Sequence, residues 1–128
     1  MEKTVLLVDD VDDIRFVLKI LIERHGYRVI EASNGQEAIE NAMADEPDLI
    51  IMDLAMPTVD GLEATRQIRA NPGTSKIPIV AVTAYRDKYR DQAIKAGFTD
   101  LVDKMDFMED VGKVVERHLK SAKSVNGE

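Results

Sequence analysis

The chain has 128 residues, of which 17 are Lys or Arg and 24 are Asp or Glu, so its formal net charge is −7. This length fits one domain with its own core, and the negative charge argues against direct binding to nucleic-acid phosphates. The lack of cysteine excludes disulfides and metal–thiolate sites, and no apolar run approaches the roughly 20 residues that span a bilayer.

Short apolar runs alternate along the chain with stretches in which apolar residues recur at helical spacing. In chain order these patterns predict a strand over residues 4–8, a helix through 14–22, a strand over 27–32, a helix through 38–42, a strand over 49–52, a helix through 62–68, a strand over 77–82, a helix over 87–96, a strand at 101–102 and a helix through 111–119. The ten elements therefore form five strand-then-helix units.

Several boundaries carry their own signals. Asn34 followed three residues later by Glu37 has the spacing of a capping box at a helix start. Gly97 is a typical C-terminal stop for the helix before it. Apolar periodicity ends near residue 120, so we expect one domain over residues 1–120 and a disordered tail over residues 121–128.

Strands that are each followed by a helix imply a parallel sheet, because each crossover returns the chain to the same end. Right-handed crossovers place helices on both faces, so we predict a doubly wound α/β fold with a five-stranded parallel sheet. Ligands bind such sheets in the crevice outside the carboxyl ends of the strands. The residues that follow each apolar run are therefore the candidates for a functional site.

Three carboxylates, one hydroxyl and one ammonium follow the strands at this edge. They are Asp9, Asp10, Asp53, Thr83 and Lys104. Neighbouring carboxylates repel each other and tend to take up a proton or a cation, and oxygen ligands suit Mg²⁺, which is usually shared with a phosphate. A carboxylate beside such a cation can attack phosphorus, while a lysine and a threonine can stabilise the phosphoryl oxygens.

On these residues the chain resembles the receiver domain of two-component response regulators, in particular the single-domain chemotaxis-regulator type, over residues 3–120. The matching motifs are Val8-Asp9-Asp10, Met52-Asp53-Leu54, Met56-Pro57, Asp60-Gly61, Val82-Thr83-Ala84 and Gly97 with Asp100 and Lys104. The resemblance implies a flavodoxin-like (βα)5 fold with strand order 2-1-3-4-5.

The resemblance also implies a role for each site residue. Asp53 accepts the phosphoryl group, and Thr83 and Lys104 contact that group once it is bound. Asp53 and Asp10 ligate Mg²⁺ directly, Asp9 acts mainly through water, and the backbone carbonyl of Ala55 is a further ligand.

The implied function is a phosphorylation-dependent signalling switch that catalyses only its own phosphorylation and dephosphorylation, and is not a turnover enzyme. A sensor histidine kinase or a histidine phosphotransfer protein donates the phosphoryl group. The face formed by the last two helices and the fifth strand then changes its affinity for a separate, unknown target protein. We expect a cytoplasmic monomer or weak dimer, either free-standing or part of a larger protein.

Three residues depart from the usual pattern of this family. Met105 follows the lysine where proline is usual, which argues against a cis peptide there. Leu101 stands where an aromatic switch residue is usual, and Phe98 is bulky where a small residue is common. Met105 and Leu101 leave a second interpretation open, in which a receiver-like module docks a partner constitutively.

Other interpretations of the same residues are weaker. Asp9 and Asp10 taken alone fit a strand end and a helix cap, and a calcium loop fails because Arg15 stands where glycine is required. A flavin phosphate would meet two carboxylates, and a phosphohydrolase lacks an evident second acid or base. Neither His25 nor His118 has metal-ligand spacing, and we expect His118 on a polar helix face.

Overall fold

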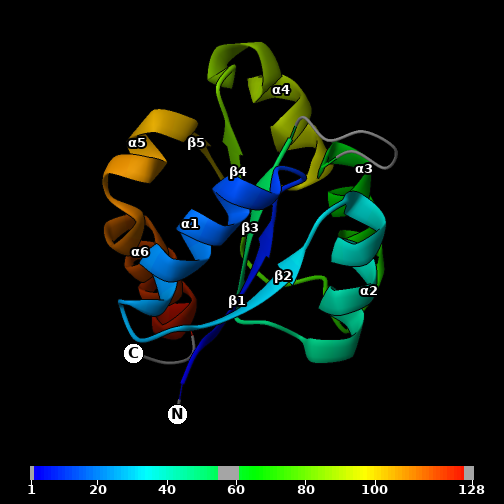
Figure 1. Cartoon of the computed structure of the whole chain (residues 1–128). Coiled ribbons are helices and arrows are strands. Elements are labelled where there is room, and N and C mark those ends of the chain that lie inside the picture. Colours follow the sequence, from blue (N-terminus) through cyan, green and yellow to red (C-terminus); the bar gives the residue numbers. More distant parts are fainter. Residues whose placement is uncertain (1, 55–60, 126–128) are drawn as a thin grey trace.

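Five parallel strands form the centre of the molecule, with helices on both sides (Figure 1). The computed structural model describes residues 2–54 and 61–125. The strands are β1 (Thr4–Val8), β2 (Arg28–Ala32), β3 (Leu49–Asp53), β4 (Ile79–Thr83) and β5 (Asp100–Asp103). Their order in the sheet is β2-β1-β3-β4-β5. The predicted doubly wound α/β fold and its strand order are therefore confirmed.

The helices divide between the two faces of the sheet. They are α1 (Asp12–Glu23), α2 (Gly35–Asp45), α3 (Gly61–Ala70), α4 (Arg86–Ala96), α5 (Lys104–Glu109) and α6 (Val111–Val125). Helices α1, α5 and α6 lie on one side of the sheet and α2 and α3 on the other, with α4 near the carboxyl end of β4 (Figure 1). In the described part of the chain, no helix is both long and apolar enough to cross a bilayer.

Strand β1 shows why helices pack on both faces of the sheet. Val5 and Leu7 pack in the cluster that includes α1 and α6, while Leu6 and Val8 pack in the cluster that includes α2 and α3. This alternation follows from the two-residue period of a strand. All four side chains are at most 1% exposed, and burying each contributes roughly 1.5–3 kcal/mol.

The predicted capping box at the start of α2 is half present. The side chain of Asn34 accepts a hydrogen bond from the backbone N–H of Glu37 (2.9 Å). Glu37 Oε1 accepts from the backbone N–H and the hydroxyl of Ser33 (both 2.8 Å) instead of turning to the N–H of Asn34. These two bonds hold the pKa of the Glu37 carboxyl below its usual value.

Strand β4 begins two residues later than predicted, at Ile79. Pro78 has no N–H to donate to the ladder, and the carbonyl of Ile77 accepts a hydrogen bond from Arg69 Nη1 (2.7 Å). Arg69 Nε also donates to the carbonyl of Gly97 (2.9 Å). One partly buried guanidinium therefore connects the loops that precede β4 and β5 to the end of α3.

The C-terminal part of the chain differs from the prediction in two ways. Residues 104–109 form helix α5, which the sequence patterns did not indicate. Helix α6 continues to Val125, five residues beyond the predicted end of the domain at residue 120. Lys, Ala and Ser in this stretch are compatible with helix, and residues 126–128 of the predicted tail lie outside the described residues.

Candidate functional site

The carboxyl ends of β1 and β3 bring three carboxylates together. Asp9 and Asp10 follow β1, and Asp53 is the last residue of β3. These two strands are hydrogen-bonded neighbours, with Val8 opposite Met52. One oxygen from each carboxylate lies within 4.8 Å of the other two. The structure thus brings together the three acids that the sequence analysis placed at this edge.

Asp9 is held by hydrogen bonds to both its side chain and its backbone. It is 2% exposed, and its Oδ1 accepts a hydrogen bond from the backbone N–H of Val11 (2.9 Å). Its backbone carbonyl accepts from Arg15 Nη1 (2.7 Å). Both bonds fix the turn between β1 and α1, so that the second carboxylate oxygen of Asp9 faces the site.

Arg15 was not among the predicted site residues. Besides its bond to Asp9, it pairs with Asp12 (2.8 Å) and Glu31 (3.1 Å). Burial acts to lower the pKa of the guanidinium, but the bonds to these two carboxylates outweigh it and raise the pKa. Arg15 therefore connects three parts of the chain: the start of α1, strand β2 and the turn that carries Asp9.

Lys104 is the cation of the site. Its Nζ lies 3.7 Å from Asp9 Oδ2 and 3.9 Å from Asp53 Oδ2. These distances are ion-pair contacts, longer than a direct hydrogen bond. Three carboxylates and one ammonium give the four side chains a formal charge of −3 + 1 = −2. A divalent cation would offset this charge, and the all-oxygen donor set fits Mg²⁺.

Lys104 is positioned by helix α5, which it begins. Asp103 caps this helix, because its Oδ1 accepts from the backbone N–H of Met105 (2.9 Å). A proline after the lysine, as in most of the resembling family, would have no such N–H. Phe107, one turn along the helix, is completely buried. The described residues contain no cis peptide.

Thr83 lies at the end of β4, the strand next to β3. It is 2% exposed, and its hydroxyl oxygen accepts a hydrogen bond from the backbone N–H of Tyr85 (3.0 Å). The hydroxyl proton remains available to donate to another group. Tyr85 is the N-cap residue of α4, so the side chain of Thr83 is connected directly to the start of that helix.

Of the motif residues that follow Asp53, the structure describes some and leaves others outside the described residues. Ala55, predicted as a backbone ligand, lies outside the described residues, as do Met56, Pro57 and Asp60. Gly61 is described, and a Cβ there would lie 2.6 Å from the backbone oxygen of Asp53. Only glycine lets the start of α3 approach the strand end that carries Asp53 so closely.

The two histidines lie apart from the acid cluster. His25 Nδ1 contacts the carbonyl of Leu21 (2.9 Å). His118 is not on a polar face as expected: it is 7% exposed, with Nδ1 2.7 Å from the carbonyl of Val114 and Nε2 2.9 Å from Asp100 Oδ2. His118 therefore joins α6 to the start of β5.

Comparison with known proteins identifies the family. The model of the response regulator receiver domain matches residues 5–116. PilH of Pseudomonas aeruginosa is 36% identical over 88 residues, covering 69% of this chain and 72% of PilH. The polar-differentiation response regulator DivK of Brucella anthropi is 38% identical over 97 residues, covering 76% of this chain and 79% of DivK.

Solved structures agree with this assignment. The receiver domain of a sensor histidine kinase from Pseudomonas aeruginosa has a TM-score of 0.86 and 30% identity, covers 94% of this chain and 99% of its own, and has a magnesium ion coordinated in its active-site cleft. The chemotaxis protein CheY4 of Vibrio cholerae has a TM-score of 0.85 and 28% identity, with 91% and 98% covered. The chain belongs to the response regulator receiver domains of two-component signalling.

Proposed function

We propose that this receiver domain is a phosphorylation-dependent switch that accepts a phosphoryl group on Asp53 with Mg²⁺, acting in the bacterial cytoplasm as a monomer or weak dimer. The single observation that carries this proposal is the convergence at one strand edge of three carboxylates within 4.8 Å, with the Lys104 ammonium 3.9 Å from Asp53. A cluster that only terminated strands would not need a lysine aimed at its centre.

The chemistry follows from the charges at this edge. A carboxylate oxygen of Asp53 attacks phosphorus, the bond from phosphorus to the donor's histidine nitrogen breaks, and that nitrogen keeps the electron pair. Lys104 offsets the negative charge of the phosphoryl oxygens. When bound by Asp9, Asp10 and Asp53, Mg²⁺ supplies positive charge against both the carboxylates and the phosphoryl oxygens. The domain would catalyse only this transfer and the later hydrolysis, not turnover of another substrate.

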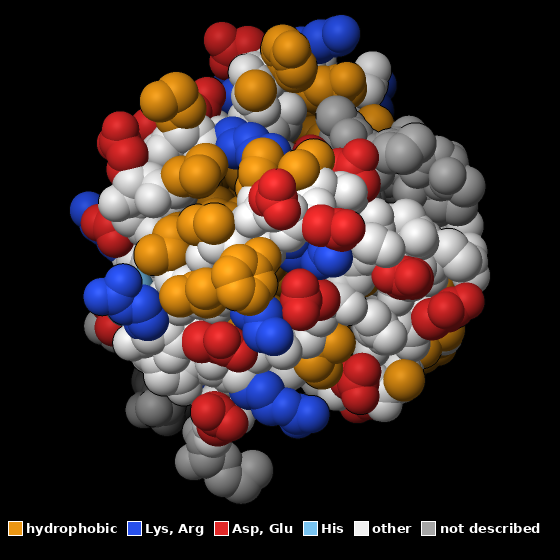
Figure 2. All heavy atoms as spheres, viewed as in Figure 1, with side chains coloured by type: hydrophobic (Ala, Val, Ile, Leu, Met, Phe, Trp, Pro, Cys, Tyr) orange, Lys and Arg blue, Asp and Glu red, His pale blue; other side chains and the backbone are white. Residues whose placement is uncertain are grey.

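The proposed donor is a sensor histidine kinase or a histidine phosphotransfer protein. An exposed apolar surface beside the acid site supports docking of such a partner. Hydrophobic side chains gather over α1 and α5 (Figure 2), and the exposed ones on these helices are Phe16, Val17, Ile20, Met105 and Met108. Helix α1 begins two residues after Asp10, and α5 begins at Lys104, so a partner bound here would lie next to Asp53.

The proposed switch runs through Thr83. A phosphoryl group on Asp53 offers an acceptor for the Thr83 hydroxyl, which now accepts from the N–H of Tyr85 at the start of α4. Movement of the hydroxyl weakens this bond and shifts the start of α4. The face that responds is formed by α4, β5 and α6. These are the last two helices and the fifth strand of the predicted scheme. The last predicted helix carries the label α6 because the structure has an additional short helix, α5, before it.

Intact mass spectrometry of the full chain with Mg²⁺ and acetyl phosphate tests this proposal. We expect a phosphoryl adduct on the wild-type protein, none on Asp53→Asn, and the wild-type level on Asp45→Asn, which changes an exposed acid at the end of α2. An adduct of equal abundance on Asp53→Asn would mean that another residue accepts the group. Phosphate release over many turnovers would instead indicate a phosphohydrolase.

A receiver-like module that docks its partner constitutively is the second candidate. It is favoured by Leu101, an aliphatic residue that is only partly buried against the cluster of Leu54, Leu62 and Ala81, where a rotating aromatic ring is usual in the family. The same assay separates the two candidates: no adduct on the wild-type protein, with partner binding intact, would support the constitutive module.

A further inference from the structure

Most of the polar groups of Asp9 are bound by groups outside the acid site. Its backbone N–H donates to the carbonyl of Ala32 (3.1 Å). Its carbonyl accepts from Arg15 Nη1 (2.7 Å), and its Oδ1 accepts from the N–H of Val11 (2.9 Å). The remaining oxygen, Oδ2, lies 3.7 Å from Lys104 Nζ. The position of Oδ2 in the acid site therefore depends on how these bonds hold the residue.

Arg15 supplies the one bond among these that comes from a side chain, because Ala32 and Val11 contribute backbone groups. The start of α1 gives the turn no further support of this kind. Val11 is the N-cap residue of that helix and forms no side-chain cap bond, since valine has no oxygen to accept from the first turn. The turn that carries Asp9 therefore relies on the guanidinium of Arg15.

The guanidinium is itself held in place by two carboxylates. Nη2 of Arg15 lies 2.8 Å from Asp12 Oδ1, and Nε lies 3.1 Å from Glu31 Oε1. The second oxygen of Glu31 pairs with Lys19 (3.3 Å), and the carbonyl of Glu31 accepts from Asn41 Nδ2 (3.2 Å). The side chain of Arg15 is only 14% exposed. Such a planar donor group, bound on three sides, fixes the carbonyl of Asp9 in one direction.

Strand β2 thereby acts on the acid site although it contributes none of the predicted site residues. It is an edge strand beside β1 (Figure 1). Two consecutive residues of β2 hold Asp9: Ala32 accepts from its N–H, and Glu31 holds the arginine that donates to its carbonyl. Asp9 is therefore fixed on the side that faces away from Asp53.

The charges around Arg15 balance each other. Asp12, Arg15, Lys19 and Glu31 are two acids and two cations, so together they carry no formal net charge. Charge and geometry then predict opposite effects of losing Arg15. Removal of a cation near a metal site strengthens Mg²⁺ binding by Coulomb's law. Removal of a bond that orients a ligand residue weakens metal binding by about 10- to 100-fold.

We propose that Arg15 is a positioning residue for Mg²⁺: its bond to the carbonyl of Asp9, braced by Glu31 of β2, keeps Oδ2 of Asp9 in the acid site. Geometry outweighs charge here because both neighbouring carboxylates already offset the guanidinium. This inference rests on the magnesium site of the proposed function. It adds a residue that touches neither the ion nor the phosphoryl group.

Calorimetric titration of the full chain with Mg²⁺ tests the inference. We expect Arg15→Gln to bind Mg²⁺ about tenfold more weakly than the wild-type protein. The matched control is Lys19→Gln, which also removes a cation paired with Glu31 but leaves the bond to Asp9 intact, and should keep the wild-type affinity. Urea unfolding of each variant confirms that the titrated samples are folded.

The Mg²⁺ dependence of phosphorylation by acetyl phosphate separates positioning from a general loss of structure. If Arg15 acts through the metal, Arg15→Gln is phosphorylated slowly at limiting Mg²⁺ and at the wild-type rate at saturating Mg²⁺. A variant that was only destabilised would be slow at every Mg²⁺ concentration, and that result would overturn the inference.

Unchanged or tighter Mg²⁺ binding in Arg15→Gln would also overturn it, as would an equal loss of affinity in Lys19→Gln. If Arg15→Gln does not fold, Arg15→Lys decides. Lysine keeps the charge but replaces the planar fork by one ammonium, so we expect several-fold weaker Mg²⁺ binding. Wild-type affinity in that variant would then contradict the inference.

Intact mass of the same samples distinguishes this inference from the proposed function. Arginine-dependent Mg²⁺ binding in a wild-type protein that forms no phosphoryl adduct supports the role of Arg15 and contradicts the switch. An adduct on the wild-type protein, with equal Mg²⁺ affinity in Arg15→Gln, supports the switch and overturns this inference. A wild-type protein that binds no Mg²⁺ contradicts both.

Discussion

The ends of β1 and β5 each place a charged side chain near Asp53, and they are held in different ways. At the end of β1, Asp9 is fixed by hydrogen bonds from Val11 and from Arg15, a residue of α1 near the surface. At the end of β5, Lys104 is placed by the short helix α5, whose anchor is the fully buried Phe107. Hydrogen bonds of the turn therefore place the acid, whereas core packing places the cation. Mutations in the core should disturb Lys104 before they disturb Asp9.

Phe107→Ala should have the largest effect on stability and would test the apolar anchor. Phe107 is 0% exposed and packs in the core cluster with Val102 and Val111. Removing a buried phenylalanine ring costs about 3–5 kcal/mol. The measurement is urea unfolding, with Met108→Ala, a half-exposed side chain on the same helix, as control. If both variants lose the same unfolding free energy, Phe107 is not the anchor of α5.

Lys104→Gln should have the next largest effect. It should slow phosphorylation and strengthen Mg²⁺ binding. Phosphorylation by acetyl phosphate should slow by about a hundredfold, because the charge that offsets the phosphoryl oxygens is lost. Mg²⁺ should bind several-fold more tightly, because an ammonium 3.7 and 3.9 Å from the ligand carboxylates no longer repels the cation.

Calorimetric Mg²⁺ titration and timed intact-mass measurements separate these two effects. The matched control is Lys113→Gln, which removes an exposed ammonium from α6 and should change neither quantity. Weaker Mg²⁺ binding in Lys104→Gln would mean that the lysine organises the carboxylates more than it opposes the metal.

The sequence predicted the β1 end well and the β5 end poorly, for physical reasons. Parallel strands share one carboxyl edge, so acids after two apolar runs must meet there, and Asp9, Asp10 and Asp53 do. Helix α5 has only six residues and one buried side chain, Phe107. That is too short to show a helical period, so nothing in the pattern marked it.

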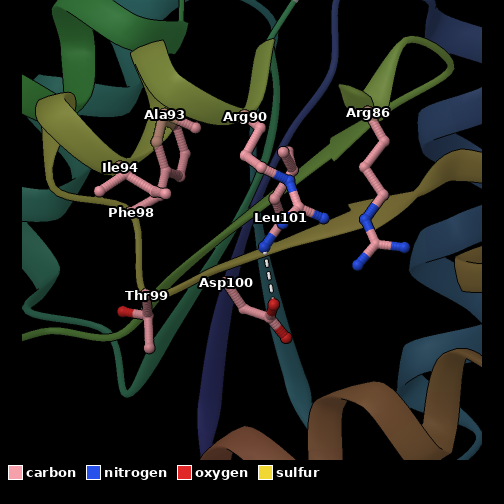
Figure 3. Close-up of a pocket in the computed structure, with 8 residues that line it drawn as sticks. All are labelled: Arg86, Arg90, Ala93, Ile94, Phe98, Thr99, Asp100 and Leu101. Atoms are coloured by element: carbon pink, nitrogen blue, oxygen red, sulfur yellow. Dashed lines mark hydrogen bonds between the residues drawn. The ribbon is translucent and has the colours of Figure 1, made fainter. Parts of the chain in front are cut away.

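Side-chain packing explains the other differences. His118 follows Val114 by four residues and so lies on the apolar face of α6, but its polarity suggested the opposite face. Its buried position depends on Asp100 of β5, which a helix pattern alone does not reveal. The hollow lined by Arg86, Arg90 and Leu101 (Figure 3) likewise requires α4, a mostly polar helix, to pack against β5. The succession of strands and helices and the parallel α/β class can therefore be predicted from period and spacing, whereas contacts between elements require coordinates.

Arg15→Gln should have a smaller effect and would test the β1 end. The variant loses the bond to the carbonyl of Asp9 and two ion pairs, from a side chain that is 14% exposed. We expect a loss of about 1–2 kcal/mol in unfolding free energy. Lys19→Gln is the control, because Lys19 also pairs with Glu31 (3.3 Å) but has no bond to Asp9. Equal losses would assign the effect to Glu31 and not to the turn that carries Asp9.

Met105→Pro should have the smallest effect and would show whether the usual family residue suits this chain. Proline removes the N–H that Asp103 accepts at 2.9 Å and disfavours helical backbone at Lys104. Met105→Ala is the matched control, because it removes an exposed side chain and keeps the N–H. We expect the proline variant to be about 1 kcal/mol less stable than the alanine variant in urea unfolding. If the two variants were equally stable, the cap would not hold α5, and Phe107 alone would determine the position of Lys104.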